Sequence, residues 1–338
     1  MASQSAIVAF IPDYKKSSKM KHGPDSTPPV LGIVVPCYNE EEALPEAART
    51  LQDLLEEMKK ERLIAPTSCI WFVDDGSPDN TWKMISDISQ ENTKVRGIKL
   101  SRNRGHQNAL MAGLLTAKGD VLVSVDADLQ DDITVIKRMM RDHISGKDII
   151  YGVRSSRTSD SWFKRTTAES FYTLLKWIGV EIIYNHADFR LMSRRALNAL
   201  EDYGEVNLFL RGIVPTIGFP SSVVEYERSE RHAGDSKYPL RRMLALALNG
   251  ITSFSVAPLR IIAGLGFLIF LISMVLSAWA LWTRLFSSDA VPGWASSVLP
   301  MYLLGGIQLL SLGVIGEYVA KIYMETKHRP RFVIEEVI

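Results

Sequence analysis

Two long runs of uncharged residues near the C-terminal end constrain the architecture of this chain more than any other feature. Residues 261–282 read IIAGLGFLIFLISMVLSAWALW, and these 22 residues include no charged side chain. As a helix, the run would extend roughly 33 Å, enough to cross the core of a bilayer. A second uncharged run covers the 19 residues from Val298 to Gly316 and is interrupted only by the polar Gln308. We predict two transmembrane helices; the alternative is a buried hairpin in the core of a soluble protein, which two runs of this length disfavour.

The charges that flank these runs predict their orientation. Arg241, Arg242 and Arg260 precede the first run, and four basic residues follow the second. Among the 15 residues between the runs, the only charged ones are Arg284 and Asp289. Because basic residues gather on the cytoplasmic side of membrane proteins, we expect both termini to be cytoplasmic and the short loop to lie outside. No segment at the N-terminus is typical of a signal peptide, and we interpret residues 1–29 as a flexible leader.

Between residues 30 and 155, short β-rich segments alternate with helical patterns. The strands are expected near 31–36, 69–75, 95–101, 121–128 and 148–155, and the helices near 43–60, 80–90, 105–117 and 131–143. This rhythm is typical of βαβ units and predicts an open, mostly parallel sheet of Rossmann-like α/β type. Ligands of such sheets bind beyond the carboxyl ends of the strands, and polar clusters follow all five predicted strands.

Composition and motif searches exclude several classes of protein. The net charge of +1 gives no reason to expect a nucleic-acid partner. Cys37 and Cys69 are the only cysteines, too few for a disulfide framework or a structural zinc site. The first predicted strand is followed by VVPCYNEEE, which has no glycine, so the phosphate-binding turn of nicotinamide enzymes is missing, and the chain has no Walker A loop.

The sequence Asp126-Ala127-Asp128 ends the fourth predicted strand, and Asp131 and Asp132 follow closely. Carboxylates this close repel one another unless they share a cation. A hard divalent ion such as Mg²⁺ or Mn²⁺ accepts a few carboxylates together with substrate phosphates. The alternative is an ordinary strand end with an aspartate that caps the next helix, which would account for Asp131.

Seven motifs strengthen the interpretation of the acidic pair as a cation site. In chain order they read VVPCYNEEEALP, VDDGSPDNT, LSRNRGHQNALMAGL, VDADLQD, YGVRSSR, DFRLMSRRAL and ERHAGDSKY. Together with the paired C-terminal spans, this order resembles the family 2 glycosyltransferases of GT-A fold that load a sugar onto a polyprenyl phosphate. The bactoprenol glucosyltransferases are the most similar branch, and dolichyl-phosphate mannose synthases and aminoarabinose transferases are more distant. The resemblance covers the chain from about Val30 to its C-terminus.

This resemblance implies roles for individual residues. Those expected to line the nucleotide-sugar pocket are Pro36, Tyr38, Glu40, Val73, Asp75, Asp126 and Ala127. Those expected to hold Mg²⁺ or Mn²⁺ are Asp126, Asp128 and Gln130. Those expected to meet phosphates of the donor or the lipid acceptor are Arg154, Arg231 and Lys237, which are suitable types for anion binding. Asp188 matches the acidic residue that the family places near the reacting centre, so Asp188 and Asp128 are the catalytic candidates.

The resemblance also implies a reaction: inverting transfer of a hexose to undecaprenyl phosphate, on the cytoplasmic face of the plasma membrane. Glucose from UDP-glucose is the expected donor, and mannose, N-acetylhexosamine or aminoarabinose donors are the alternatives. The acceptor phosphate is mostly dianionic at neutral pH and needs no strong base. Asp188 would stabilise an oxocarbenium-like transition state, orient the sugar or accept a proton, and the sequence leaves these three open.

The chain is expected to divide into five parts. They are the leader 1–29, a GT-A domain 30–238, an interfacial amphipathic helix 239–257, a two-helix transmembrane domain 258–320 and a cytoplasmic tail 321–338. Gly305 and Gly306 would allow helix packing between copies, so a homo-oligomer is possible. We interpret Arg157, Arg194 and Arg195 as solvated or membrane-facing charges, and His106 as a local hydrogen-bonding residue.

Two other classes of protein share part of these features. A processive polysaccharide synthase would need a Q-x-x-R-W motif, and the chain contains no Arg-Trp pair. A non-catalytic membrane scaffold with a nucleotide-binding fold would have no need for mutually repelling carboxylates.

Overall fold

The structure is a computed structural model that describes residues 27–154, 186–205, 208–226 and 294–338, together with 259, 262–269, 271 and 275. The described elements of the first half alternate strictly between strand and helix. They are β1 (Leu31–Cys37), α1 (Leu44–Lys60), β2 (Cys69–Asp74), α2 (Thr81–Glu91), β3 (Val95–Leu100), α3 (His106–Thr116), β4 (Val121–Ser124), α4 (Val135–Ile144) and β5 (Ile149–Arg154). The predicted strands and helices of this half are confirmed, and their ends differ by a few residues.

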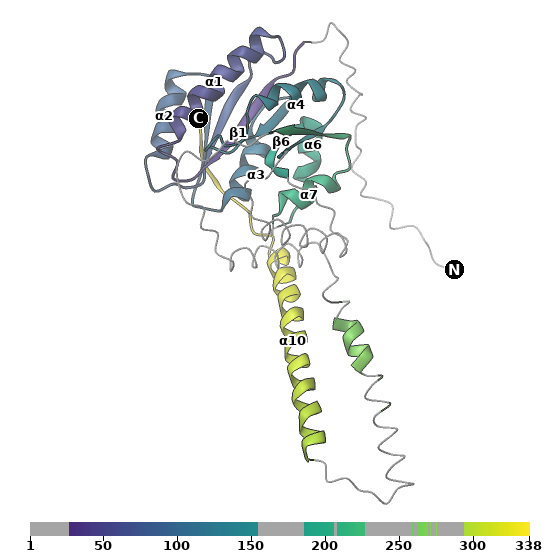
Figure 1. The fold of residues 1–338 in the computed structure, drawn as a ribbon. Coiled ribbons are helices and arrows are strands. Elements are labelled where there is room, and N and C mark those ends of the chain that lie inside the picture. The colour runs from purple at the N-terminus through teal and green to yellow at the C-terminus, as the bar shows by residue number, and fades with distance from the viewer. Residues whose placement is uncertain are drawn as a thin grey trace, which may run out of the picture.

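The described elements of the second half are fewer. They are β6 (His186–Ser193), α6 (Arg194–Glu201), α7 (Leu210–Thr216), β7 (Ser221–Tyr226), α10 (Trp294–Thr326) and β8 (Ile334–Val337). Figure 1 shows the strands gathered in one sheet with helices on both of its faces, and α10 projecting away from this layered domain.

All eight described strands form one sheet, in the order β7-β5-β6-β4-β1-β2-β3-β8. Strands β4, β1, β2 and β3 are mutually parallel, and β5 pairs in parallel with β7. Strand β6 lies antiparallel between β4 and β5, and β8 runs antiparallel to β3. The sheet is therefore mixed, although β1 to β5 still direct their carboxyl ends to one edge.

Each face of the sheet is covered by helices that bury an apolar stripe. In α1, Leu44, Ala48, Leu51, Leu55 and Met58 recur at intervals of three or four residues and are buried. They pack with α2 and α4 on one face, while α3, α6 and α7 cover the other. This three-layer packing fixes the sheet edge at which the polar loops gather.

The segment predicted as a cytoplasmic tail, 321–338, includes a helical end and a strand of the sheet. Helix α10 continues to Thr326, and β8 then pairs with β3, where Lys99 forms an ion pair of 2.9 Å with Glu335. The last residue, Ile338, exchanges backbone hydrogen bonds with Gly97. Among the described residues, no helix is long and apolar enough to qualify as a membrane span. The interfacial helix predicted at 239–257 and the leader up to residue 26 lie outside the described residues.

Candidate active site

The acidic pair lies just beyond β4, at the edge where the parallel strands end. Ala127 is buried, whereas the side chain of Asp126 is 44% exposed and Asp128 is also exposed. Burial raises the pKa of Asp126; His106 opposes this shift, and Asp188, Asp131 and Asp128 add to it by charge repulsion. The expected concentration of negative charge is therefore present at this position.

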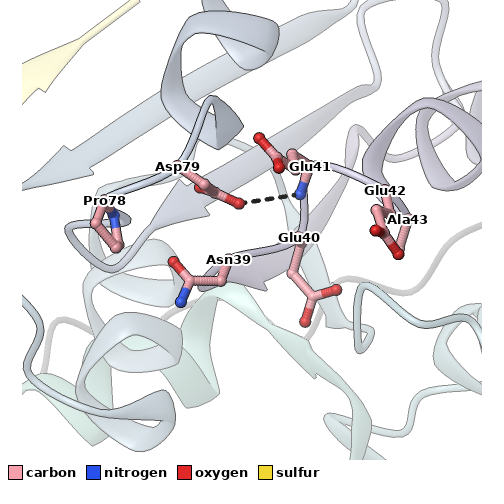
Figure 2. Close-up of a pocket in the computed structure, with 7 residues that line it drawn as sticks. All are labelled: Asn39, Glu40, Glu41, Glu42, Ala43, Pro78 and Asp79. Carbon is pink, nitrogen blue, oxygen red and sulfur yellow. Dashed lines mark hydrogen bonds between the residues drawn. The ribbon is translucent and has the colours of Figure 1, made fainter. Parts of the chain in front are cut away.

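An acidic cavity of about 470 Å³ opens between the loops that follow β1 and β2. It is lined by Asn39, Glu40, Glu41, Glu42, Ala43, Pro78 and Asp79 (Figure 2). The backbone N–H of Glu41 donates to Asp79, and the carboxylate of Glu40 points away from that of Glu41. Burial raises the pKa of Glu40, and Asp128, Asp79 and Asp126 raise it further. Glu40 therefore belongs to the same field of negative charge as the acidic pair.

The donor chemistry of this field suits a hard divalent ion. Within the described ranges, no three His, Cys, Asp or Glu side chains are grouped closely enough to form a metal cage on their own. Mg²⁺ commonly uses one or two protein carboxylates and takes its other ligands from water and substrate phosphates. Asp126, whose side chain is 44% exposed, and the exposed Asp128 fit that mode of binding, and the backbone N–H of Gln130 donates to Asp128 Oδ1 at 3.3 Å.

Four of the residues expected in the nucleotide-sugar pocket are buried: Pro36, Val73, Asp75 and Ala127. Val73 is fully buried beneath α3, and Pro36 is its neighbour in the sheet. Asp75 is 2% exposed, and its two oxygens accept the backbone N–H groups of Arg104 and Gly105 at 2.7 and 2.8 Å. Val73 and Asp75 are therefore closed to a ligand, whereas Tyr38 is 45% exposed.

Asp188 on β6 is the centre of a buried network. Its Oδ1 accepts from Arg190 Nη2 at 2.6 Å, and its Oδ2 accepts from Gln107 Nε2 at 3.0 Å and from Arg211 Nη2 at 3.1 Å. Burial acts to raise the pKa of Asp188, but Arg190 and Arg211 outweigh burial and lower it to about 2. His106 Nε2 lies 3.7 Å from Asp188 Oδ2 and 3.6 Å from Asp126 Oδ1, so it connects this network to the acidic pair.

Arg154 is held at the end of β5 by Asp131 and Tyr226. Its Nη2 lies 3.1 Å from Asp131 Oδ1, and its Nε donates to Tyr226 Oη at 3.3 Å. The suggestion that Asp131 caps the next helix is wrong, because Asp132 instead accepts from Thr134 at the start of α4. Arg231 and Lys237 lie outside the described residues, so their expected contacts with the phosphates of donor or acceptor stay a prediction.

The interpretation of Arg194 as a solvated or membrane-facing charge is wrong, whereas Arg195 is exposed, as expected of a solvated charge. Arg194 donates to the backbone carbonyls of Gly119 and Ala117 at 2.9 and 2.8 Å, which closes the loop before β4. Arg195 pairs with Asp148. Arg157 lies outside the described residues.

Comparison with known sequences decides the family of this fold and site. The sequence profile described as glycosyl transferase family 2 matches residues 32–201, which include the acidic pair and Asp188. The chain belongs to glycosyl transferase family 2. It is therefore a glycosyltransferase, and its mixed α/β sheet is of the GT-A type.

Relatives of this family 2 glycosyltransferase match along most of its length. A Bacillus subtilis protein described as the uncharacterized glycosyltransferase YkoT is 52% identical, with 91% of each chain covered. A prophage bactoprenol glucosyl transferase homolog of Escherichia coli is 39% identical, over 91% of this chain and 99% of the relative. The bactoprenol glucosyl transferase of Shigella phage SfV is 40% identical, over 90% of this chain and 98% of the relative.

The sequence motifs do not reveal every residue of this glycosyltransferase site. Gln107 and Arg190 stand inside quoted motifs without an assigned role, and Arg211 belongs to none of them. Their contacts with Asp188 join α3, β6 and α7, up to 81 residues apart in the chain.

Proposed function

We propose that the chain transfers glucose from UDP-glucose to undecaprenyl phosphate with inversion, producing a lipid-linked sugar for cell-envelope glycosylation. The observation that carries the proposal is the acidic pair at the sheet edge: the side chain of Asp126 is 44% exposed, Asp128 is exposed, and Glu40 lies in the same field of negative charge. Such a concentration of negative charge repels a nucleotide diphosphate unless a cation is bound with it. The names of the relatives support glucose as the sugar and bactoprenol as the lipid.

Asp126, Asp128 and Gln130 would hold Mg²⁺ or Mn²⁺, which supplies neutralisation of the charge that develops on the departing nucleotide. Tyr38 and Glu40 would contact the nucleoside from the loop after β1. Arg154 would meet a phosphate while Asp131 and Tyr226 keep its guanidinium in place. Because the acceptor phosphate brings its own negative oxygen, the main task of these side chains is to align it with the anomeric carbon.

The acceptor is a lipid, so we also propose that the two uncharged runs span the plasma membrane with the catalytic domain on the cytoplasmic face. Support comes from the sequence of the runs and from apolar side chains that face outward on α10. Met301, Leu312 and Ile322 are 70%, 63% and 61% exposed, which is costly in water and favourable in lipid. Part of each run lies outside the described residues.

The proposal is tested by the substitution Asp128→Asn in the full-length protein in detergent micelles. We expect transfer of labelled glucose to undecaprenyl phosphate to fall by more than about 100-fold, because one charge of the cation site is lost. Asp132→Asn is the matched control: Asp132 lies four residues away, accepts a hydrogen bond from the backbone N–H of Thr134, and its substitution should leave transfer within about 2-fold. Thermal unfolding verifies that both variants are folded.

Unchanged transfer by Asp128→Asn would contradict the cation site. A panel of UDP-glucose, UDP-N-acetylglucosamine and GDP-mannose decides the donor in the same assay. Selective use of a sugar nucleotide other than UDP-glucose would contradict the glucose assignment while leaving lipid glycosylation in place. Absence of transfer from every donor would contradict the proposed function itself.

A further inference from the structure

Arg211 lies at the exposed end of the Asp188 network, and no sequence motif assigns it a role. Its side chain is 41% exposed, whereas that of Arg190, on the other side of Asp188, is 1% exposed. Arg211 reaches both oxygens of Asp188, with its Nε 3.4 Å from Oδ1 and its Nη2 3.1 Å from Oδ2. This two-point contact holds the plane of the guanidinium in one orientation.

The position of Arg211 is fixed by its helix as well. The backbone N–H of Leu210 donates to Gln107 Oε1 at 3.1 Å, and Gln107 Nε2 donates to Asp188 at 3.0 Å. Gln107 thus joins the first turn of α7 to the same carboxylate that binds Arg211. Because His106 lies within 3.7 Å of both Asp188 and Asp126, contacts run from Arg211 through Asp188 and His106 to the acidic pair.

The same contacts argue against Asp188 as a proton acceptor. Its two oxygens already receive hydrogen bonds from Arg190, Arg211 and Gln107, and the side chain is 7% exposed. A carboxylate that is paired in this way gains little from taking a proton, because protonation would break charge-assisted bonds. Its arrangement is that of an anion that orients cations.

We propose that Arg211 binds a phosphate group of the substrates and that Asp188 is a positioning residue that holds the guanidinium of Arg211 in place. The proposal rests on the proposed function, which brings two phosphate sources to this edge: the diphosphate of the donor and the phosphate of the lipid. A fixed, half-exposed guanidinium is the side chain best suited to pair with phosphate oxygens. It also supplies positive charge where the carboxylates alone would repel both substrates.

The test uses Arg211→Gln in the full-length protein, which keeps the Asp188 to Arg190 pair intact. Binding of UDP with Mg²⁺ is measured by calorimetry, and the KM for undecaprenyl phosphate is measured in mixed micelles. We expect about a 10-fold or greater loss of affinity for one of the two ligands. Weaker UDP binding assigns Arg211 to the donor diphosphate, and a higher KM for the lipid alone assigns it to the acceptor.

Arg195→Gln is the matched control. Arg195 is also 41% exposed and also pairs with an aspartate, Asp148. This pair lies at the start of β5 and just after the end of β6, whereas Asp188 lies near the start of β6. This variant should leave both affinities within about 2-fold of wild type. If Arg211→Gln changes neither ligand more than Arg195→Gln does, the proposal is overturned.

The positioning role of Asp188 is tested by Asp188→Asn and by the double variant with Arg211→Gln. If Asp188 acts through Arg211, its substitution reproduces the same loss of affinity, and the double variant loses little more than either single variant. A large fall in kcat with unchanged affinities, absent in Arg211→Gln, would overturn the positioning role. Failure of the proposed function would appear differently, as an unmodified protein that binds neither UDP nor the lipid phosphate.

Discussion

Arg190 is a charged side chain in the interior of the domain, and its surroundings explain how the chain tolerates it. It is 1% exposed, pairs with Asp188 at 2.6 Å and donates from Nη1 to the carbonyl of Leu210 at 3.1 Å. Burial lowers the pKa of Arg190, and Asp188 acts in the opposite direction. A buried ion pair adds little net stability, but loss of one partner leaves the other charge uncompensated.

We therefore expect Arg190→Met to destabilise the protein by on the order of 3 kcal/mol, because Asp188 would lose its buried partner. The free energy of unfolding is measured in urea. Arg96→Met, at an exposed position of β3, removes the same charge from the same sheet and should change stability by less than about 0.5 kcal/mol. A similar small effect of Arg190→Met would contradict the structural role of the pair.

How far the sequence predicts the site differs from residue to residue. Asp126 and Asp128 are contiguous with a predicted strand, so a local motif sufficed to place them at the sheet edge. Val73 and Asp75 also end a strand, yet the direction of their side chains depends on packing against α3 and the loop at 104–105, which a motif does not encode. The contact of Asp188 with Arg211 requires β6 and α7 to meet in space.

At the scale of elements, α3 packs against β1 and β2 more closely than a side chain would allow. A Cβ on Gly113 would lie 2.4 Å from Val34 Cγ1 and 2.7 Å from Val73 Cγ2, both on buried residues. Alanine in a helix normally gains up to about 1 kcal/mol over glycine. Overpacking a well-filled core costs about 1 to 3 kcal/mol, so the steric effect is expected to prevail.

Gly113→Ala should accordingly lower the free energy of unfolding by about 1 kcal/mol or more. Gly204→Ala provides the comparison, since nothing lies within 4 Å of a Cβ at that position. The free energy of unfolding of each variant is measured in urea and compared with that of the unmodified protein. Equal stability of the two variants would mean that α3 can shift away from the sheet at no cost.

The elements that the sequence predicted well are those with local signals. The first five strands are short apolar runs that end in polar clusters, and the helices between them have amphipathic spacing. The antiparallel strand β6 was not anticipated between β4 and β5, because its neighbours in the sheet are set by pairings such as Val121 with Ser193, 72 positions later. Strand β8 was missed for the same reason, as its partner β3 lies more than 200 residues earlier.

At the scale of the whole molecule, β8 closes the chain back onto the domain from which it left. The domain precedes the first uncharged run, and β8 follows the second, yet both belong to one sheet. Arg331, between α10 and β8, also donates to the backbone carbonyl of Tyr203. A chain whose two ends share one sheet must cross a membrane an even number of times if it crosses at all.

That constraint agrees with two crossings and predicts the side on which the loop between the runs lies. Ser288→Cys, in this loop, should react with a membrane-impermeant maleimide added outside intact cells. Ser145→Cys, exposed at the end of α4, should react only after the cells are opened, because it belongs to the sheet domain. The unmodified protein gives the background, since Cys37 is buried and Cys69 is partly buried. Labelling of Ser288→Cys only after opening would place the loop with the domain and contradict the crossing, and labelling of Ser145→Cys in intact cells would reverse the orientation.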